Sequence, residues 1–488
     1  MKSMGRILSN NKTIIAVMVV FGFVFGLLSF SNHFNFRTYC LDLGVYSHAI
    51  YRYAHLQSAD CAIYLWNNQN LFADHFDLYL PLLSPLYWLF GQYTLLVVQI
   101  VFALLGGLGT YKFICTYTDK RSVPLLSMIG FYGFFGLWHA LSFDYHTSVV
   151  ATMLVPWLFY AIRRQRYGWG LALVVLISIG KETMPLWLVF ITLALLWDYR
   201  KDKVAFRWLT IYCILSVLLF VGIALWVMPC FGTNEQVLWR YSYMGHGFKE
   251  MAAFMVAHPM ETLSNFFTNF THDSDYDGLK LEFWLCTLAS GLFLVVRKPH
   301  WLLMLVPVVG MKMLARDAGF WGISNQYNVE LTPVIVCGSY AAICSLGREN
   351  IRPWCAVAAT LLVLVTTLYS TSNPCTNIRK DNVRVFASRH YRQRDFSTAT
   401  AREMMAQIPD DASVCATTMF VPHLAMRDSV YMFPIGLGSN AEYYLLKLRH
   451  WCYYEGEEDK IAEMVADTSG YRLICTDGDL VLLKQNRR

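Results

Sequence analysis

Side chains suited to acid–base chemistry stand at the edges of long apolar runs in this chain. Asp42 precedes an amphipathic stretch, and Asp74-His75 begins a short apolar segment. Lys181-Glu182 separates two apolar runs. Ionisable groups at membrane depth are costly and usually serve a function, with a partner nearby. A carboxylate fixed at such a boundary could take a proton from a substrate hydroxyl as a general base.

Each of these signals also has a purely structural interpretation. Asp42 and Asp74 could cap helices, since Asp is a common N-cap residue. Lys181 could extend from a plain turn at the level of the lipid headgroups. Asp74 and His75 could also act together, either as metal ligands or as a carboxylate–imidazole pair. The dipeptide alone does not decide between these interpretations.

Two further loops carry polar side chains suited to binding a substrate. The stretch HALSFDYHT contains Asp144 and His146, and the loop 316–328 contains Arg316, Gln326 and Tyr327. The thirteen cysteines form no C-x-x-C pair and no zinc-type spacing. The chemistry is therefore expected from carboxylates, histidines and cations gathered in loops.

The composition shows what kind of protein must position these loops. Hydrophobic residues make up 56% of the 488-residue chain and charged residues only 15%, whereas a soluble domain carries about 25% charged residues. The mean hydropathy is +0.38. These values exclude a soluble globule, a disordered chain and a coiled coil. The net charge of +6 does not indicate nucleic-acid binding, because the excess lies in short loops between apolar runs.

Eleven apolar runs are predicted to be membrane-spanning helices. A span needs about 20 residues, with a range of about 17–25, so the shorter runs must extend into their aromatic flanks. The predicted spans are residues 14–31, 92–116, 123–142, 147–162, 167–180, 183–197, 205–229, 280–296, 300–315, 329–346 and 353–370. The segment 78–90 is apolar but brief and has two prolines, which favours a re-entrant or interfacial segment.

Positive charge alternates from loop to loop and predicts an orientation. If the N-terminus is cytoplasmic, every cytoplasmic loop is basic, as the positive-inside rule requires. The outward loops, including the long loops 32–77 and 230–279, are poorer in Lys and Arg for their length. This orientation places all the candidate residues on the outer face and leaves the C-terminus outside.

The last part of the chain differs from the rest. Residues 1–370 are predicted to form the transmembrane domain, and residues 371–488 a polar domain outside the membrane. Two helical stretches, TATAREMMAQI and EEDKIAEMVADT, alternate with the β-like runs SVCATT, YRLICT and LVLLKQ. Asp477-Gly478 is a turn signal between the last two runs. The tail is therefore predicted to be a small α/β domain.

Short motifs in a fixed order resemble a bacterial family of predicted membrane proteins, domain of unknown function 2079. The motifs are NFRTYCLDLG at 35–44, Asp74-His75-Phe76, SPLY at 84–87, Asp144-Tyr145-His146, Lys181-Glu182, Gln326-Tyr327 before Pro333, and Pro422-His423-Leu424 with Arg427. The resemblance covers nearly the whole chain. Two positions depart from the family pattern: Thr147 follows His146 where Pro is expected, and Thr183 follows Glu182 where an acidic residue is common.

That family is grouped with the GT-C glycosyltransferases, multi-spanning enzymes that use polyprenyl-phosphate sugars. The resemblance therefore implies an all-α polytopic membrane fold of the GT-C type in the bacterial cytoplasmic membrane. It also implies a polyprenyl-phosphate-linked sugar and membrane lipid as partners, and no nucleic acid. The implied reaction is sugar transfer from such a donor to an acceptor on the extracytoplasmic face.

The resemblance also suggests roles for the candidate residues. GT-C enzymes place a catalytic carboxylate in the first outside loop, and Asp42 matches that position. Asp74 and Glu182 are the further candidate catalytic residues. The candidate substrate-binding residues are His75, Asp144, His146, Lys181, Arg316, Gln326 and Tyr327, of which Lys181, His146 and Arg316 could hold the phosphate leaving group. No cofactor is certain; a divalent metal, Mg or Mn, stays open, with Asp42, Asp74 and His75 as candidate ligands.

Two other functions compete with the enzyme. A non-catalytic protein could bind lipid-linked glycans for an assembly, and a transporter or flippase would line its path with charged residues. Few charges lie mid-span and no inverted repeat is visible, which argues against transport. If Asp42, Asp74, His146 and Glu182 converge on one outward site, the enzyme is favoured over the binding protein.

Overall fold

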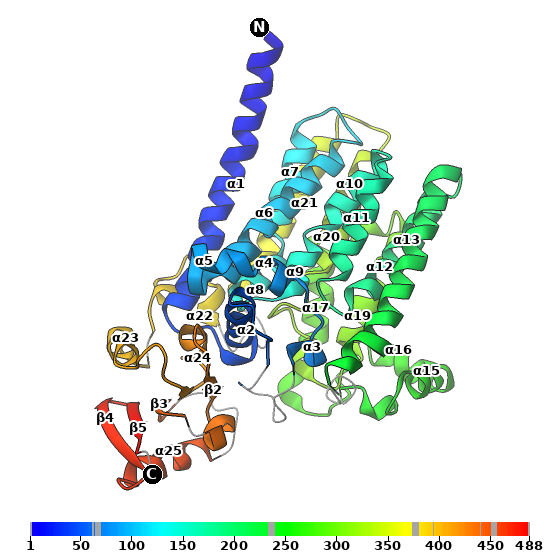
Figure 1. The fold of residues 1–488 in the computed structure, drawn as a ribbon. Helices are drawn as coiled ribbons and strands as arrows, with labels where there is room; N and C mark the ends of the chain where they lie inside the picture. The colour runs from blue at the N-terminus through cyan, green and yellow to red at the C-terminus, as the bar shows by residue number, and fades with distance from the viewer. Residues whose placement is uncertain are drawn as a thin grey trace.

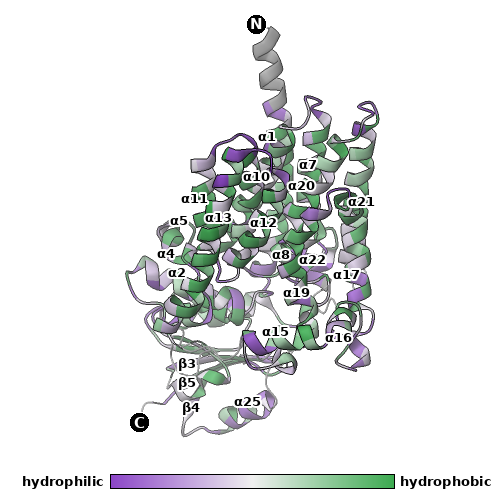
Figure 2. Ribbon diagram, turned by 90° about the vertical axis from the view of Figure 1, so that its right-hand side faces the viewer, coloured by the Kyte–Doolittle hydropathy of each residue, from purple (hydrophilic) through white to green (hydrophobic). Residues whose placement is uncertain are grey.

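Long apolar helices run side by side through most of the chain, and a small sheet lies at one end of them (Figure 1). The computed structural model describes residues 2–60, 63, 70–232, 240–372, 380–393, 395–439, 441–449 and 456–486. Figure 2 shows hydrophobic residues along the whole length of the bundle and hydrophilic residues toward its two ends. The fold class predicted from the sequence is confirmed.

Each of the eleven predicted spans falls on an apolar helical segment. Six segments in the described residues are long and apolar enough to cross a membrane: 11–34, 79–114, 122–142, 203–230, 274–295 and 352–372. Five apolar segments are shorter: 147–163, 167–178, 184–198, 299–313 and 331–344. The main helices are α1 (Lys2–Phe34), α6 (Thr94–Ile114), α7 (Ser122–Tyr132), α8 (Phe135–Ser142), α9 (Thr147–Thr152), α10 (Val155–Arg163), α11 (Tyr167–Ser178), α12 (Met184–Asp198), α13 (Lys203–Gly222), α17 (Leu279–Thr287), α18 (Phe293–Val295), α19 (Val306–Met313), α20 (Leu331–Cys344) and α21 (Arg352–Ser372).

Short helices connect the bundle at the end that carries the sheet. They are α2 (Val45–Ala54), α3 (Leu71–Asp74), α4 (Tyr79–Leu83), α5 (Tyr87–Phe90), α15 (Phe248–Ala257) and α16 (Pro259–Ser264), with a π-helical turn, η1, at Cys40–Gly44. The apolar segment before α6 is broken into α4 and α5 because Pro81 and Pro85 cannot donate backbone hydrogen bonds. Gly91, with φ of 53°, then turns the chain into α6.

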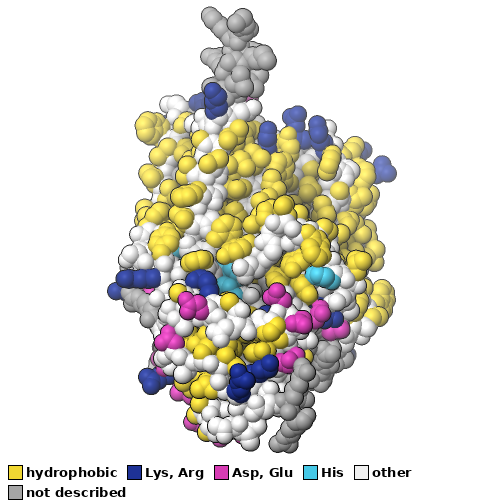
Figure 3. Space-filling view, turned by 60° about the vertical axis from the view of Figure 1, so that its left-hand side comes forward, with side chains coloured by type: hydrophobic (Ala, Val, Ile, Leu, Met, Phe, Trp, Pro, Cys, Tyr) yellow, Lys and Arg dark blue, Asp and Glu magenta, His cyan; other side chains and the backbone are white. Residues whose placement is uncertain are grey.

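Contacts between loops show that the basic loops share one end of the bundle. Lys120 Nζ donates to the carbonyl oxygen of Glu349 over 2.8 Å, and Arg163 bonds to Thr116. Figure 3 shows mainly Lys and Arg among the charged side chains near the N-terminal end, an apolar band below them, and a mixture of Asp, Glu, His, Lys and Arg where the band stops. The charge alternation thus corresponds to two chemically different ends.

The C-terminal part forms a five-stranded sheet of order β2-β1-β3-β5-β4. The strands are β1 (Val414–Ala416), β2 (Val430–Met432), β3 (Tyr443–Lys447), β4 (Tyr471–Asp477) and β5 (Leu480–Gln485), and the helices are α22 (Lys380–Val383), α23 (Thr398–Ala406), α24 (Val421–Leu424) and α25 (Glu457–Ala466). β1 pairs in parallel with β2 and β3, whereas β5 is antiparallel to β3 and β4. The five elements that the sequence predicted in this region are present; β2, β3, α22 and α24 were missed.

This C-terminal part is packed directly on the segment that follows α1. The Thr418 hydroxyl accepts a hydrogen bond from the backbone N–H of Cys40 over 3.2 Å, and His48 Nδ1 bonds to the Ala425 carbonyl over 3.1 Å. At the end of α1, the ring of His33 stacks on that of His423 with centroids 4.2 Å apart. The turn that carries Asp42 is therefore fixed by residues almost 400 positions away in sequence.

Gly136 in α8 lies against the backbone at residue 328 and offers a test of this packing. A Cβ atom at Gly136 would stand 2.3 Å from the Asn328 carbonyl oxygen. Because backbone cannot rotate away as a side chain can, Gly136→Ala is expected to destabilise the protein by about 1–3 kcal/mol. Thermal unfolding of the purified protein measures the change. Gly310→Ala is the control, since nothing lies within 4 Å of a Cβ there; equal effects of the two substitutions would contradict the prediction.

Candidate functional site

Asp42 and His146 are in direct contact at the end of the bundle that carries the sheet. Asp42 lies in η1, and its Oδ1 is 2.9 Å from Nε2 of His146 in the α8–α9 connection. That connection is held in place by Gln99 of α6, which donates to the Asp144 carbonyl oxygen and accepts from the His146 N–H, both over 3.0 Å. The carboxylate of Asp144 accepts the backbone N–H of Tyr39 over 2.8 Å. Asp144 thus joins the loop of His146 to the segment before Asp42.

The pairing fixes what each group can do. A carboxylate accepts hydrogen bonds, so the Nε2–H of His146 is the donor of the hydrogen bond to Asp42. The His146 side chain is 7% exposed and that of Asp42 is 26% exposed. The carboxylate therefore retains access from outside while the imidazole orients it from behind. A base held in this way is positioned to take a proton from an incoming hydroxyl.

A second group surrounds Glu182, which follows α11. Glu182 Oε1 lies 3.4 Å from His75 Nδ1, and its Oε2 accepts the backbone N–H of Phe76 over 3.2 Å. Burial by itself raises the pKa of Glu182, but the imidazole of His75 and the charge of Lys181 overcome this effect and lower that pKa to about 2. Asp74 Oδ2 is 3.9 Å from His75 Nε2. Glu182 is thus paired with His75, and the charge of Lys181 acts on it at longer range.

The two groups meet around Tyr46 of α2, a residue that the sequence analysis did not single out. Burial raises the pKa of the Tyr46 phenol, and the charges of Asp42, Asp74, Asp77 and Glu182 raise that pKa further. The four carboxylates therefore lie near one phenol although they come from three separate segments. The amphipathic pattern of α2 predicted its helix but could not show which face meets the carboxylates.

Asp77 is the buried member of this group. Its carboxylate accepts hydrogen bonds from the Thr147 hydroxyl and, over 2.9 Å, from the backbone N–H of Tyr79. Burial raises the pKa of Asp77 to about 7 in spite of these bonds. Asp77 thus holds the start of α9, next to His146, to the start of α4.

The raised pKa of Asp77 predicts a pH-dependent stability. The folded protein holds this proton up to about pH 7, whereas the unfolded chain loses it near pH 3.9. Stability from this group is therefore complete below about pH 4 and is lost as the pH rises through 7. Asp77→Asn cannot ionise, so its melting temperature should gain on that of the wild type between pH 4.5 and 7.5. A constant difference over this range would contradict the prediction.

A third set of side chains approaches Asp42 from the other side. Burial raises the pKa of the Tyr327 phenol, and the charge of Asp42 raises it further, while Arg240 opposes this effect. The ring of Tyr327 stacks on Phe320 with centroids 4.0 Å apart, and the guanidinium of Arg240 lies over the same Phe320 ring at 4.9 Å. Arg240 is also 3.9 Å from Asp317. No local pattern distinguishes Arg240 from the other charged residues of its long loop.

The remaining predicted residues differ in their placement. Gln326 is buried and bonds to the Tyr327 hydroxyl, so it belongs to the third set. Lys181 faces Glu182, His75 and Glu330. The side chain of Arg316 is exposed, and the contact that links its residue to this region is its backbone N–H, which donates to the Arg240 carbonyl over 2.7 Å. Arg240 is thus the arginine whose side chain lies over Phe320, the ring that stacks on Tyr327, whereas the side chain of Arg316 is exposed.

Comparison with protein-family models identifies the chain. The model of the predicted membrane protein family DUF2079 matches residues 32–478. The chain belongs to this family. The match includes every residue of the three sets, and a comparison with curated proteins found no match. The family resemblance of the sequence motifs is thereby confirmed.

Solved structures with a similar fold are GT-C glycosyltransferases. ArnT from Cupriavidus metallidurans bound to undecaprenyl phosphate has a TM-score of 0.52 and 9% identity, covering 96% of the DUF2079 chain and 97% of ArnT. The same protein in the apo state has a TM-score of 0.50 and 12% identity, covering 99% of the DUF2079 chain and 98% of ArnT. The Archaeoglobus fulgidus oligosaccharyltransferase has a TM-score of 0.44 and 11% identity, covering 89% of the DUF2079 chain and 69% of the oligosaccharyltransferase. The likeness to ArnT shows a shared fold over the whole chain.

The donor atoms at the site bear on the metal that the sequence left open. Within the described residues, no three His, Cys, Asp or Glu side chains are grouped so that they could hold a metal ion. Asp42 faces His146, while Asp74 and His75 face Glu182. These residues alone do not form a metal site, and a requirement for Mg or Mn stays a prediction.

Proposed function

We propose that this protein is an integral-membrane glycosyltransferase that transfers a sugar from a polyprenyl-phosphate donor to an acceptor on the extracytoplasmic face. The observation that carries the proposal is the contact between Asp42 and His146, at the outer end of a fold shared with ArnT. ArnT has been crystallised with undecaprenyl phosphate, which supports a donor of the same chemical class. The apolar flanks of the bundle would hold the polyprenyl chain.

The reaction follows from the chemistry of such a donor. Asp42 takes the proton of an acceptor hydroxyl, and the hydroxyl oxygen forms a bond to the anomeric carbon of the sugar. The bond between that carbon and the phosphate oxygen breaks, and polyprenyl phosphate leaves with the electron pair. His146 keeps the Asp42 carboxylate oriented through its Nε2–H donor. The products are the glycosylated acceptor and polyprenyl phosphate.

The leaving phosphate needs cations to stabilise its charge. Lys181 and Arg240 are the candidates, because each lies beside one of the carboxylate sets. Lys181 stands at the α11–α12 turn, and Arg240 is 33% exposed above Tyr327 and Phe320. A fork-shaped guanidinium matches the geometry of phosphate oxygens, which favours Arg240 as the direct phosphate ligand.

The convergence of the carboxylates favours an enzyme over the two alternatives. Asp42, Asp74 and Glu182 act on one phenol, Tyr46, at one end of the bundle, rather than lining a path through it. A binding protein would need cations and apolar surface for a lipid-linked glycan, but not a carboxylate oriented by a histidine. Such an arrangement supports Asp42 as a general base that an acceptor can reach from outside.

The test is a transfer assay on the full chain in liposomes. The substrates are a panel of synthetic polyprenyl-phosphate sugars, with an extract of envelope glycolipids and glycans as acceptor. Mass spectrometry should detect polyprenyl phosphate released together with one glycosylated product. Binding of the donors without any release would instead identify the non-catalytic protein. A C-terminal reporter active only in the cytoplasm would refute the outward orientation.

A further inference from the structure

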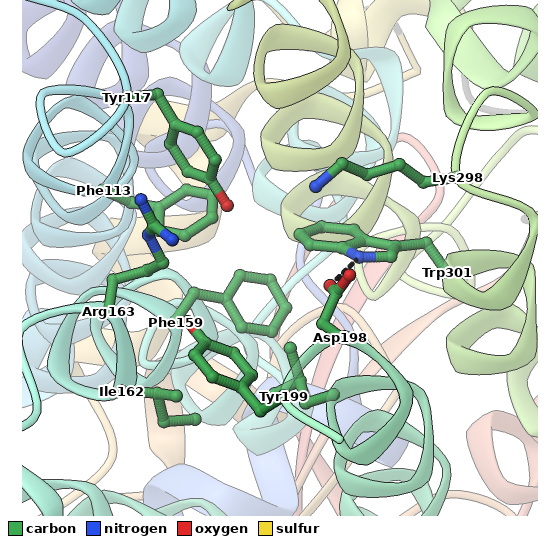
Figure 4. A pocket seen from close by; sticks show the side chains of 10 residues that line it. Phe113, Tyr117, Phe159, Ile162, Arg163, Asp198, Tyr199, Lys298 and Trp301 are labelled. Carbon is green, nitrogen blue, oxygen red and sulfur yellow. Dashed lines mark hydrogen bonds between the residues drawn. The ribbon is translucent and has the colours of Figure 1, made fainter. Parts of the chain in front are cut away.

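A small cavity lies at the opposite end of the bundle, among the basic loops (Figure 4). It has a volume of about 130 Å³ and is formed where α6, α10 and α12 end and the 3₁₀ helix at Pro299–Leu305 begins. Drug-sized ligands occupy about 300–1,000 Å³, so this cavity fits only a small group. The carboxylate sets lie at the other end of the bundle, so this cavity has no part in the proposed transfer.

The floor of the cavity is apolar and rigid. The rings of Phe113, Phe159 and Trp301 form it, with centroid separations of 5.6 Å between the two phenylalanines and 5.3 Å between Phe159 and Trp301. All three side chains are buried within the core. Such a floor is preformed, and it leaves the polar groups at the rim to determine what binds.

Two cations face this floor from opposite sides. Figure 4 shows Arg163 and Lys298 directed toward the cavity across the rings. The ammonium of Lys298 lies 5.4 Å above the Trp301 ring and 5.6 Å from that of Tyr117, and the guanidinium of Arg163 lies 4.3 Å over the same tyrosine. Burial lowers the pKa of Lys298, which indicates that the charged form lacks full solvation there.

The carboxylate at the rim does not neutralise these cations. Asp198 Oδ2 accepts the indole N–H of Trp301 and its Oδ1 accepts from His300 Nε2, both over 2.8 Å. Within the described residues, no ion pair within 4.0 Å joins Asp198 to Lys298 or Arg163. Arg163 bonds instead to Thr116 and to the Tyr199 hydroxyl. The cavity therefore presents two positive charges and one carboxylate whose oxygens are already engaged.

We propose that this cavity binds a phosphate-type oxyanion, held by Arg163 and Lys298 over the aromatic floor. A guanidinium offers a planar pair of donors that matches phosphate oxygens, and an ammonium supplies a point charge. The tyrosine hydroxyls of Tyr117 and Tyr199 at the rim add neutral donors. The cavity lies where the apolar helices end, so the phosphate can belong to a phospholipid headgroup of that leaflet or to a soluble ion.

The first arm of the test uses delipidated full-length protein in detergent. Inorganic phosphate is titrated against chloride at equal ionic strength, and the thermal unfolding midpoint is followed. A ligand of the folded state raises this midpoint in a saturable way. Lys298→Gln and Arg163→Gln each remove a charge-assisted hydrogen bond and should weaken the apparent affinity by about 10- to 100-fold.

Neighbouring residues provide matched controls. Arg297→Gln and Arg164→Gln change the same charge at adjacent positions that do not line the cavity, and they should bind as the wild type does. Lys298→Arg keeps the charge and should retain binding, which separates loss of charge from loss of fold. Equal weakening by the adjacent controls, or no saturable response of the wild type to phosphate or anionic phospholipid, would overturn the proposal.

The second arm distinguishes the two sources. Wild type and Lys298→Gln are placed in nanodiscs of phosphatidylcholine with or without phosphatidylglycerol, and native mass spectrometry then counts the phospholipids that remain bound. A headgroup site predicts one retained phosphatidylglycerol on the wild type and none on the variant. A site for soluble phosphate predicts the midpoint shift of the first arm without that retention. Neither signal in the wild type would refute the proposal.

Discussion

Asp42→Asn is expected to lower glycosyl transfer by about 10²–10⁴-fold, the usual contribution of general-base catalysis, while donor binding persists. The amide keeps the shape of the carboxylate. Its oxygen can still accept the Nε2–H of His146, which lies 2.9 Å from Oδ1 of Asp42 in the wild type. It cannot take a proton from an acceptor hydroxyl. The measurement compares initial rates of polyprenyl phosphate release with donor binding under the same conditions.

Asp60→Asn is the control for this substitution. Asp60 lies in the same segment between α1 and α4, its side chain is 42% exposed, and it is 3.7 Å from Arg52. The same chemical change there should leave transfer within twofold of the wild type, roughly what a surface position implies. Near-normal transfer by Asp42→Asn would show that Asp42 only orders its turn. The role of base would then pass to Asp74 or Glu182, without changing the class of enzyme.

The helices of the bundle could be predicted because apolarity is a local property of the sequence. Each predicted span coincides with an apolar helical segment. Lys280 and Lys312 were not singled out, because one lysine hardly changes the apolar character of a whole run. Both are buried inside segments that were counted as spans; Lys280 donates to the Asn265 and Met313 carbonyls, and Lys312 to the Phe320 and Gly322 carbonyls. They hold the backbone of neighbouring segments in place, and no local pattern shows such a partner.

The small sheet was predicted only in part, for a related reason. β4 and β5 form a hairpin with its own turn at Gly478, so the signal is local. β3 is buried on both faces along its five residues and therefore lacks the alternation that marks a strand. β2 has three residues. Their pairing with β1 depends on the intervening chain, which a window of sequence does not contain.

The site could be predicted as a group but not as a set of pairs. Loop charge and motif order brought Asp42, His146, Lys181 and Glu182 to one end of the bundle. The Asp42–His146 contact spans 104 positions, and its geometry depends on how Gln99 of α6 holds the connection after α8. The placement of α8 follows from core packing, including the close approach of Gly136 to the backbone at residue 328. A charge pattern carries no information about that placement.

Glu182→Ala is expected to destabilise the protein by about 3–5 kcal/mol, the usual loss when one partner of a buried ion pair is removed. The Glu182 side chain is 16% exposed. Without it, the N–H of Phe76 loses its acceptor, and the charges of His75 and Lys181 lose their counter-charge. Unfolding in detergent, followed by temperature or by denaturant where it is reversible, measures the loss.

The exposed ion pair of Glu349 and Arg352 makes this prediction specific to burial. These partners are 3.4 Å apart, the same separation as Glu182 and His75, but the Glu349 side chain is 66% exposed. Glu349→Ala should therefore cost no more than about 1 kcal/mol, as surface pairs do. Glu182→Gln keeps an acceptor for Phe76 while removing the charge, so its stability should lie between those of Glu182→Ala and the wild type. If Glu182→Ala destabilises the protein no more than Glu349→Ala does, then Glu182 is solvated rather than paired. The group around Glu182 would then not stabilise the site.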